Sequence, residues 1–319
     1  MEKKSQHTIP KCYQKPWCDP ATPSNQTPYI WMVSKDGRQK KRKAPEKAFV
    51  STDAYTIKLP SGDRDLVIED TLAQIESTFV NLLDRKVKKQ YSLDSQDRAN
   101  LCIFAAAMFS RVDPQSRVHV NSLQQLHEKV KRMEETHNAE MSTSLEIAAM
   151  LENARPDYVA ISLQMLAELY YGMSMGIFVA PMTDHFITSD SPTVWYNPEA
   201  YKWPPFWRSP GLAQEKLEVT MPLTPRYALL LSHDEKISGY RQLPSRVVQE
   251  FNRRTRFHCD RWFVSWQGEV REEWFDPGIP PEDRWENSPE GRRTAERREK
   301  HDELRRGYEE RAASHDDAD

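Results

Sequence analysis

Four residues far apart in the sequence have side chains suited to acid–base chemistry or anion binding. They are His7, Glu69, Arg111 and Asp190. An imidazole exchanges a proton near neutral pH, and a guanidinium can clamp a phosphate or carboxylate through two parallel hydrogen bonds. A carboxylate can orient such a base or hold a metal ion. We expect the fold to bring the four together in one pocket, because mixed sets of charges are typical of sites with perturbed pKa values.

Each of these residues also has a structural interpretation. A histidine near a chain end, crowded with a proline and aromatic residues, can order the terminus by hydrogen bonding. Glu69 can pair with Arg111 to join two helices, and Glu76 lies on the same helix face about 10 Å further along. Arg111 can instead compensate a helix dipole and contact Asp113, and Asp190 can cap its own turn. The residue types alone leave both interpretations open.

Four further residues are candidates for binding: Lys11, Tyr13, Ser189 and Asn252. Lys11 and Tyr13 follow the histidine in the same short N-terminal segment. Ser189 lies in a hydroxyl-rich turn, but it has no Gly-x-Ser-x-Gly setting, which argues against a nucleophile elbow. No motif identifies a cofactor, and a divalent metal ion remains an open alternative.

The elements that must position these residues change in type along the chain. Residues 1–63 are rich in proline and aromatic residues and favour short strands. Apolar spacing then predicts five helices, over residues 68–82, 95–113, 123–133, 145–151 and 157–173. The fifth is apolar nearly all round, so we expect it to be central. Asp94 or Ser95 is the expected cap of the second, and Pro114 its expected end.

Beyond Gly176 the pattern changes to short strands. Alternation and β-branched or aromatic content predict strands over residues 185–188, 192–196, 217–221 and 227–231. A last core helix is expected from Pro244 to about residue 265. From about Glu282 the chain is almost entirely charged, which predicts a solvated single helix or a disordered tail.

These elements predict an α+β fold that is predominantly α-helical. A central helical bundle would be flanked by short antiparallel strands from the N-terminal and C-terminal parts. The expected divisions are an N-terminal segment over 1–63, a core over 64–265 and a charged tail over 266–319. The tail is a candidate contact for a protein partner.

Composition narrows the class of protein. The chain has 319 residues, a net charge of −3, four cysteines and ten glycines. These values argue against bulk attraction to nucleic acid or anionic membranes, a disulfide framework and a glycine-rich nucleotide fold. With no secretory signal or apolar span, we expect a soluble, intracellular protein in the cytoplasm that does not bind membranes. The basic run Arg38–Lys43 leaves open a nuclear signal or a nucleic-acid contact, although a solvated hairpin is the stronger interpretation.

Several short motifs occur in the order typical of one family. They are Gln6-His7-x-x-Pro10-Lys11-x-Tyr13, Ile30-Trp31-Met32-Val33 to Gly37, Asp53-Ala54-Tyr55, Ile68-Glu69 with Ile75-Glu76, Met108-Phe109-Ser110-Arg111, Phe186-Ile187-Thr188-Ser189-Asp190-Ser191-Pro192, Met221-Pro222-Leu223-Thr224-Pro225, and Asn252 with Arg261-Trp262. In this order the chain resembles the family called domain of unknown function 4238 over roughly residues 6–265. Cys12 and Gln14 depart from its pattern, and the tail lies outside it. The resemblance implies one fold and a set of positions, but no activity.

Two classes of function follow from the residues. The first is a hydrolase of a phosphodiester or another phosphate compound, such as a nucleic acid or a phosphorylated small molecule. His7 would be the acid or base, Asp190 an orienting carboxylate or metal ligand, and Arg111 the anion clamp. The alternative is a non-catalytic module that binds a ligand or partner through the same pocket or an aromatic loop around Trp195, Trp203 and Trp207. Distance separates the two, since contact chemistry needs about 3 Å.

Overall fold

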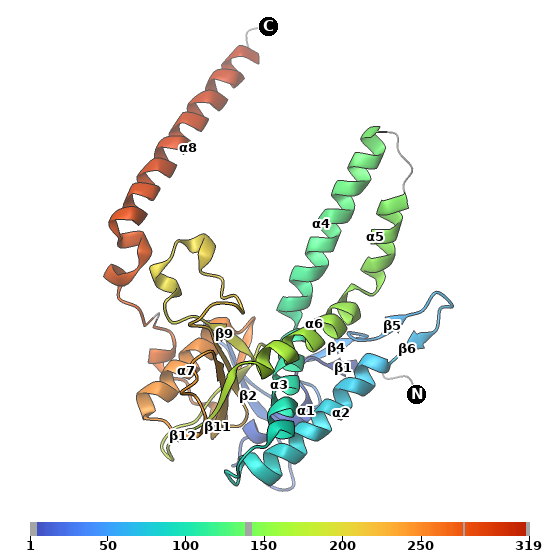
Figure 1. The fold of residues 1–319 in the computed structure, drawn as a ribbon, viewed down its shortest axis with the longest axis vertical. Helices are drawn as coiled ribbons and strands as arrows, with labels where there is room; N and C mark the ends of the chain where they lie inside the picture. Colours follow the sequence, from blue (N-terminus) through green and yellow to red (C-terminus); the bar gives the residue numbers. More distant parts are fainter. Residues whose placement is uncertain (1–4, 138–141, 277, 317–319) are drawn as a thin grey trace. The chain divides into compact units, whose positions relative to one another are not determined.

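The fold is α+β, as expected, and about half of the chain is helical. A computed structural model describes residues 5–137, 142–276 and 278–316 (Figure 1). The chain divides into two compact units. Unit 1 comprises Met1–Tyr196 and Glu218–Asp276, and unit 2 comprises Asn197–Leu217 and Pro277–Asp319. Unit 1 therefore contains both the predicted N-terminal segment and most of the predicted core.

The helices of unit 1 occupy the predicted regions, except that the first was not predicted and the one expected over 123–133 begins ten residues earlier. They are α1 (Lys11–Gln14), α2 (Val67–Leu82), α3 (Ser95–Ser110), α4 (Asp113–His137), α5 (Ser142–Glu152), α6 (Ala154–Tyr171) and α7 (Ser245–His258). Asp94 caps α3 as expected, because its side chain accepts the amide of Asp97 while Asp97 accepts the amide of Asp94. Pro114 does not end a helix but lies in the first turn of α4, where its missing N–H costs nothing.

The strands of unit 1 form four sheets. The strands are β1 (Ser5–His7), β2 (Ile30–Ser34), β3 (Lys40–Lys43), β4 (Val50–Thr52), β5 (Ile57–Lys58), β6 (Arg64–Asp65), β7 (Ser174–Val179), β8 (Thr188–Ser189), β9 (Val194–Tyr196), β10 (Glu218–Pro222), β11 (Tyr227–Ser232), β12 (Gly239–Gln242) and β13 (Trp262–Ser265). The five-stranded sheet has the order β12-β7-β11-β10-β9, and the four-stranded sheet has the order β3-β2-β13-β8. Strands β1 and β4 form one separate pair, and β5 and β6 the other. Chain segments from both ends therefore meet in one sheet.

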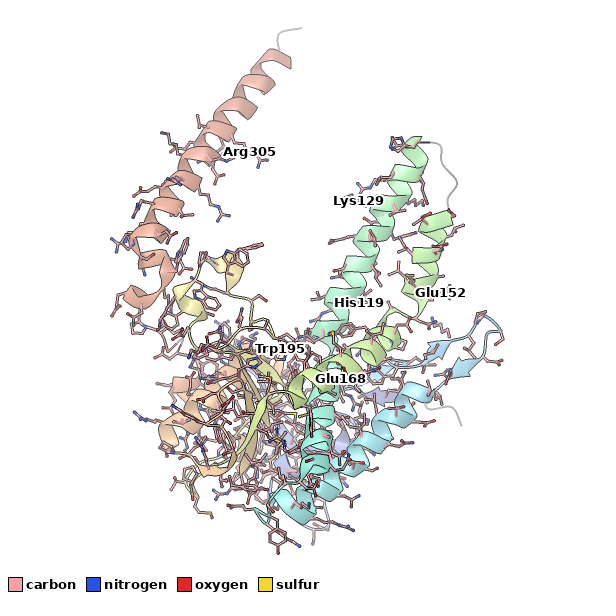
Figure 2. All side chains as sticks on the ribbon, in the orientation of Figure 1. His119, Lys129, Glu152, Glu168, Trp195 and Arg305 are labelled. Carbon is pink, nitrogen blue, oxygen red and sulfur yellow. The ribbon has the colours of Figure 1, made fainter. Side chains whose placement is uncertain are left out.

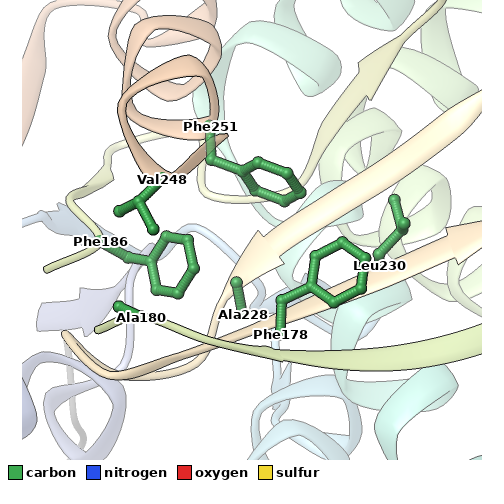
Figure 3. Close-up of a cluster of buried hydrophobic side chains, with 7 residues drawn as sticks. All are labelled: Phe178, Ala180, Phe186, Ala228, Leu230, Val248 and Phe251. Atoms are coloured by element: carbon green, nitrogen blue, oxygen red, sulfur yellow. The ribbon is translucent and has the colours of Figure 1, made fainter. Parts of the chain in front are cut away.

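Helix α7 packs on the five-stranded sheet through an apolar cluster (Figure 3). Its members come from β7, β11, α7 and the segments beside them: Phe178, Ala180, Phe186, Ala228, Leu230, Val248 and Phe251. The rings of Phe178 and Phe251 meet edge to face with centroids 5.7 Å apart. This cluster holds the segment that carries residues 185–191 against the sheet.

Three expectations about the helices are not met by the structure. Helix α6 packs against α3, but Ile161 and Met165 on its other face are 70% and 51% exposed, so α6 is not buried all round. The expected central bundle is not confirmed. Helices α4 and α5 pack on each other and extend away from the sheets as a hairpin, along which Figure 2 labels His119, Lys129 and Glu152. The helix expected to reach residue 265 ends at His258, because Cys259 has an extended backbone and β13 follows.

Unit 2 contains short 3-10 turns and one long helix. Two of the turns are Ala200–Lys202 and Pro205–Trp207. Directly after the second turn, Arg208 forms an ion pair with Glu286, with Nη1 and Oε1 2.6 Å apart. The charged tail forms helix α8 (Pro289–Asp316), one of the two states predicted for it. In the described parts of both units, no helix combines the length and hydropathy needed to cross a membrane.

Candidate functional site

A cavity of about 620 Å³ lies beside β1, α1 and α2. Three of the four expected catalytic residues line it, namely His7, Glu69 and Arg111, together with the expected binding residue Lys11. Residues from the first strand and from two helices therefore share one concave surface. A cavity of this size is within the range of small-molecule sites.

The N-terminal segment that lines the cavity is held in place by strand pairing and by two buried aromatic side chains. Strand β1 pairs with β4 so that His7 lies opposite Val50. The hydroxyl of Tyr13 donates to the carbonyl of Pro222 at 2.6 Å, and Trp17 donates its indole N–H to the carbonyl of Phe186 at 3.1 Å. Both rings are fully buried. Tyr13, expected to bind a ligand, is therefore an anchor of the segment, and burial raises the pKa of its hydroxyl.

The imidazole of His7 is bonded to the backbone through one of its two nitrogens. Its Nε2 lies 3.1 Å from the carbonyl oxygen of Pro45, and since a carbonyl only accepts, Nε2 carries the proton. Burial lowers the pKa of His7 below its ordinary 6.5, and the positive charges of Lys11 and Arg111 favour the same direction. In the neutral ring the lone pair is on Nδ1, and the lowered pKa favours that neutral ring.

Arg111 is a buried joint rather than an open clamp. Its side chain is 4% exposed; Nη1 donates to Glu76 Oε1 at 2.7 Å, and Nη2 donates to the backbone carbonyl of His7 at 2.6 Å. Its guanidinium carbon lies 5.4 Å from the centre of the Tyr55 ring. The expected pairing of Arg111 with Glu69 is wrong, because Glu76 takes that place. Both terminal nitrogens of Arg111 are therefore engaged within the fold, and its buried Nε has no hydrogen-bond partner among the described residues.

Glu69 is held at the cavity by a buried amide. Gln6 donates from Nε2 to Glu69 Oε2 at 2.9 Å and to Thr56 Oγ1 at 3.0 Å. The Oε1 atom of Gln6 accepts the backbone N–H of Tyr55 at 2.7 Å. All the hydrogen-bonding groups of the Gln6 amide are therefore used, while Glu69 Oε1 has no hydrogen-bond partner among the described residues. The sequence did not predict these hydrogen bonds of Gln6, because its only notable feature there is its place next to the histidine.

Asp190 lies elsewhere. It lines a second cavity of about 290 Å³ and not the one that holds the histidine. Its carboxylate accepts the backbone amides of Asp260, Arg261 and Trp262, each at 2.8 Å. These bonds fix the turn before β13, so the structural interpretation of Asp190 accounts for its oxygens. The structure divides the expected four-residue pocket into two places.

Ser189 and Asn252, both expected to bind a ligand, are also bonded within the fold. The hydroxyl of Ser189 accepts the amide of Ser191 at 3.0 Å. Asn252 accepts the amide of Ile187 at 2.9 Å and donates to the carbonyl of His185 at 2.8 Å. Both side chains are fully buried. Asn252 thereby joins α7 to the segment before β8, and Ser189 stabilises its own turn.

The two cysteines that line the cavity are held in the protonated thiol form rather than as reactive thiolates. Cys12 and Cys18 both line it. Burial raises the pKa of Cys12 to about 12, with the nearby Glu76 carboxylate adding to the shift, and burial also raises the pKa of Cys18. A thiol with a raised pKa reacts slowly at neutral pH. Among the described residues, no group of three or more His, Cys, Asp or Glu side chains could hold a metal ion.

Lys15 is a cavity residue that the motif did not reveal. It lies four positions after Lys11, so the two ammonium groups are on one side of the N-terminal helical turns. Neither lysine forms an ion pair within the part of the chain that the structure describes. The spacing of Lys11 and Lys15 was the available sequence signal.

The comparisons with known proteins name a family but no activity. The family model described as "Protein of unknown function (DUF4238)" matches residues 5–267, which include every residue discussed for the cavity. No curated protein and no solved structure matches the chain. The agreement extends from the first strand to the residues just after β13, well over half of the sequence. The chain therefore belongs to the DUF4238 family.

Proposed function

We propose that the cavity beside β1 binds a phosphate compound and that the protein hydrolyses it. The observation that carries this proposal is the imidazole of His7, whose pKa is lowered by burial, in one cavity with Lys11 and Lys15, which form no ion pair with a described residue. Nδ1 accepts a proton from the water that attacks phosphorus, the P–O bond to the alcohol breaks, and the alkoxide takes up a proton and leaves as the alcohol. The lysines stabilise the charge that develops on the phosphate oxygens. Glu69 and Glu46 also line the cavity and accept hydrogen bonds from the remainder of the ligand.

The mixed charge of the cavity supports a particular class of substrate. A bare inorganic anion would be attracted by the lysines but repelled by Glu46 and Glu69. A phosphate ester or diester that also carries hydroxyl or amino groups satisfies both signs of charge. The proposal therefore favours a phosphorylated small molecule over free phosphate.

The second candidate is binding without turnover. Two observations favour it: both terminal nitrogens of Arg111 are engaged within the fold, and Asp190 lies in another cavity. Under this alternative the same ligand would occupy the cavity and remain intact. The cytoplasmic location, the nuclear alternative and a protein partner for the tail stay predictions.

The test is hydrolysis of O-phosphoethanolamine and β-glycerophosphate, phosphate esters that carry an amino or a hydroxyl group, with and without Mg²⁺. The informative variant is His7→Gln, since the glutamine amide can still donate to the Pro45 carbonyl but has no basic nitrogen. We expect a loss of turnover of about 10²–10⁴-fold. The matched control is His137→Gln, at the exposed last residue of α4.

Each outcome decides between the candidates. Loss in His7→Gln with full activity in His137→Gln supports the hydrolase. Unchanged turnover in His7→Gln overturns its catalytic role. Calorimetric binding of a phosphate ester that is weakened by Lys11→Gln/Lys15→Gln, with no product formed, supports the binding module. Neither binding nor turnover with any of these esters overturns both.

A further inference from the structure

Strand β3 concentrates positive charge at a sheet edge. The segment 35–47 contains seven Lys or Arg and two Asp or Glu, a net charge of +5 in a chain whose total is −3. Within that segment, β3 itself consists of four consecutive basic residues and is the outer strand of its sheet. The polar backbone groups on its outer side are therefore free of sheet pairing among the described residues. A basic edge prevents strand aggregation, but this charge is larger than that purpose needs.

The basic side chains of β3 lie over aromatic rings on both faces of the sheet. Lys40 and Arg42 lie over Trp31, at 4.7 and 4.5 Å from the ring centre. Lys41 lies over Trp262 at 3.5 Å. The alternation follows from the two-residue period of a strand, which also separates cations of one face by about 6.6–6.8 Å. Both tryptophans are half-buried rather than covered.

The charge continues from β3 onto its neighbours. Lys41, Lys43 and Arg261 line the 290 Å³ cavity, and Arg261 also lines an open hollow of about 470 Å³ with Lys35 and Arg256. One continuous basic surface therefore extends from β3 to β13 and the end of α7.

The carboxylates beside this surface are already engaged. Asp190 accepts three backbone amides, Asp260 pairs with Arg117 at 2.7 Å, and Asp113 pairs with Arg155 at 2.7 Å. Lys41 and Lys43, in contrast, make no ion pair with any residue in the described ranges. Their charges are available to an external anion.

We propose that this surface binds single-stranded nucleic acid. The phosphates would follow Lys41, Lys43 and Arg261, and a base would stack on Trp262 as the Lys41 side chain moves to a phosphate. An acidic peptide would use the cations but not the rings. A duplex would offer no exposed base faces to the rings. The ring-and-cation arrangement thus favours a single strand, and binding there is independent of any turnover in the cavity at His7.

The test is fluorescence anisotropy with a labelled twelve-nucleotide oligothymidylate at several KCl concentrations. We expect binding that weakens with salt, and Lys41→Gln/Lys43→Gln to weaken it about tenfold and to reduce the log–log salt slope by about 1.4, or 0.7 for each lost phosphate contact. The matched control is Lys129→Gln/Lys131→Gln, which removes the same charge from exposed positions on α4.

Further measurements keep the proposal open to refutation. Quenching of tryptophan fluorescence in the unmodified protein on oligonucleotide addition would support stacking without relying on any variant. Three results would overturn the proposal: no binding at 50 mM KCl, an equal loss in the control variant, or tighter binding of polyglutamate or of a duplex of the same length. Circular dichroism of both variants checks that the fold is intact.

Discussion

Replacing Arg111 by methionine tests whether this residue is a structural joint. Methionine fills a similar volume but cannot donate a hydrogen bond. The change leaves the Glu76 carboxylate and the His7 carbonyl without the donors that now lie at 2.7 and 2.6 Å. Since the arginine side chain is 4% exposed, water cannot replace those donors freely.

The expected loss of stability follows from these two bonds. A hydrogen bond to a charged group contributes about 1.5–3 kcal/mol, so two of them contribute about 3–6 kcal/mol. Removing one member of a buried ion pair costs about 3–5 kcal/mol in measured cases. We therefore expect Arg111→Met to lower the free energy of unfolding by about 3–5 kcal/mol, a large part of a typical total of about 5–15 kcal/mol.

Urea unfolding followed by tryptophan fluorescence measures this change. Glu76→Gln should cost less than Arg111→Met, because the carboxylate side chain is 24% exposed and remains partly hydrated. The double variant Arg111→Met/Glu76→Met should be more stable than the sum of the single losses implies. If Arg111→Met does not fold, Arg111→Lys, which keeps the charge and one bond, gives the smaller loss. A loss below about 1 kcal/mol for Arg111→Met would refute the reasoning.

Three further predictions concern other residues of unit 1. Tyr13→Phe should lower the free energy of unfolding by about 1–3 kcal/mol in urea, because the Pro222 carbonyl loses its buried donor. Asp190→Asn should cost about 3 kcal/mol in the same assay, since the amide group has one oxygen to meet three backbone N–H groups. Burial lowers the pKa of His258 from 6.5 to about 4, so the unfolded chain takes up this proton first as the pH falls. Stability should therefore be lost between pH 6.5 and about 4, by at most about 3 kcal/mol, and His258→Gln should remove that part of the slope.

Matched variants separate these effects from general disruption. Tyr171→Phe, at an exposed position, should leave the urea midpoint unchanged, and an equal shift would contradict the explanation of the buried tyrosine. His301→Gln should keep the full pH slope, because that side chain is 78% exposed. An Asp→Asn change at Asp283, in unit 2, should cost less than 0.5 kcal/mol, as about ±0.5 kcal/mol is usual for surface sites.

The sequence predicted helices and caps well where the residues that stabilise the element lie within the element itself. The apolar spacing of α2 and the Asp94 capping box are complete within a few residues, and the structure has both. The prediction that α6 is buried on all sides was wrong, because the sequence shows which residues are apolar but not which face of the helix a neighbouring element covers. Ile161 is exposed since no described element packs over that face.

The site was predictable only in part for the same reason. The spacing of Glu69 and Glu76 makes them equivalent on the helix surface, and only the position of α3 decides that Arg111 meets Glu76. Asp190 has the residue type of a catalytic acid, but the amides that occupy it come from a segment seventy positions later. Pairings between distant segments are decided by tertiary packing, which single residue types do not encode.

The anchoring of the N-terminal segment has a consequence for how the protein is made. Tyr13 finds its hydrogen-bond acceptor 209 positions further along the chain, and Trp17 finds its acceptor 169 positions along. At a synthesis rate of about 5–20 residues per second, roughly 10–40 s pass between the appearance of Tyr13 and that of Pro222. During that time Tyr13 and Trp17 cannot bond to their native acceptors, because those acceptors have not yet been made. The two rings therefore stay without native partners through this interval, and unit 1 completes its fold only when its last strands have emerged.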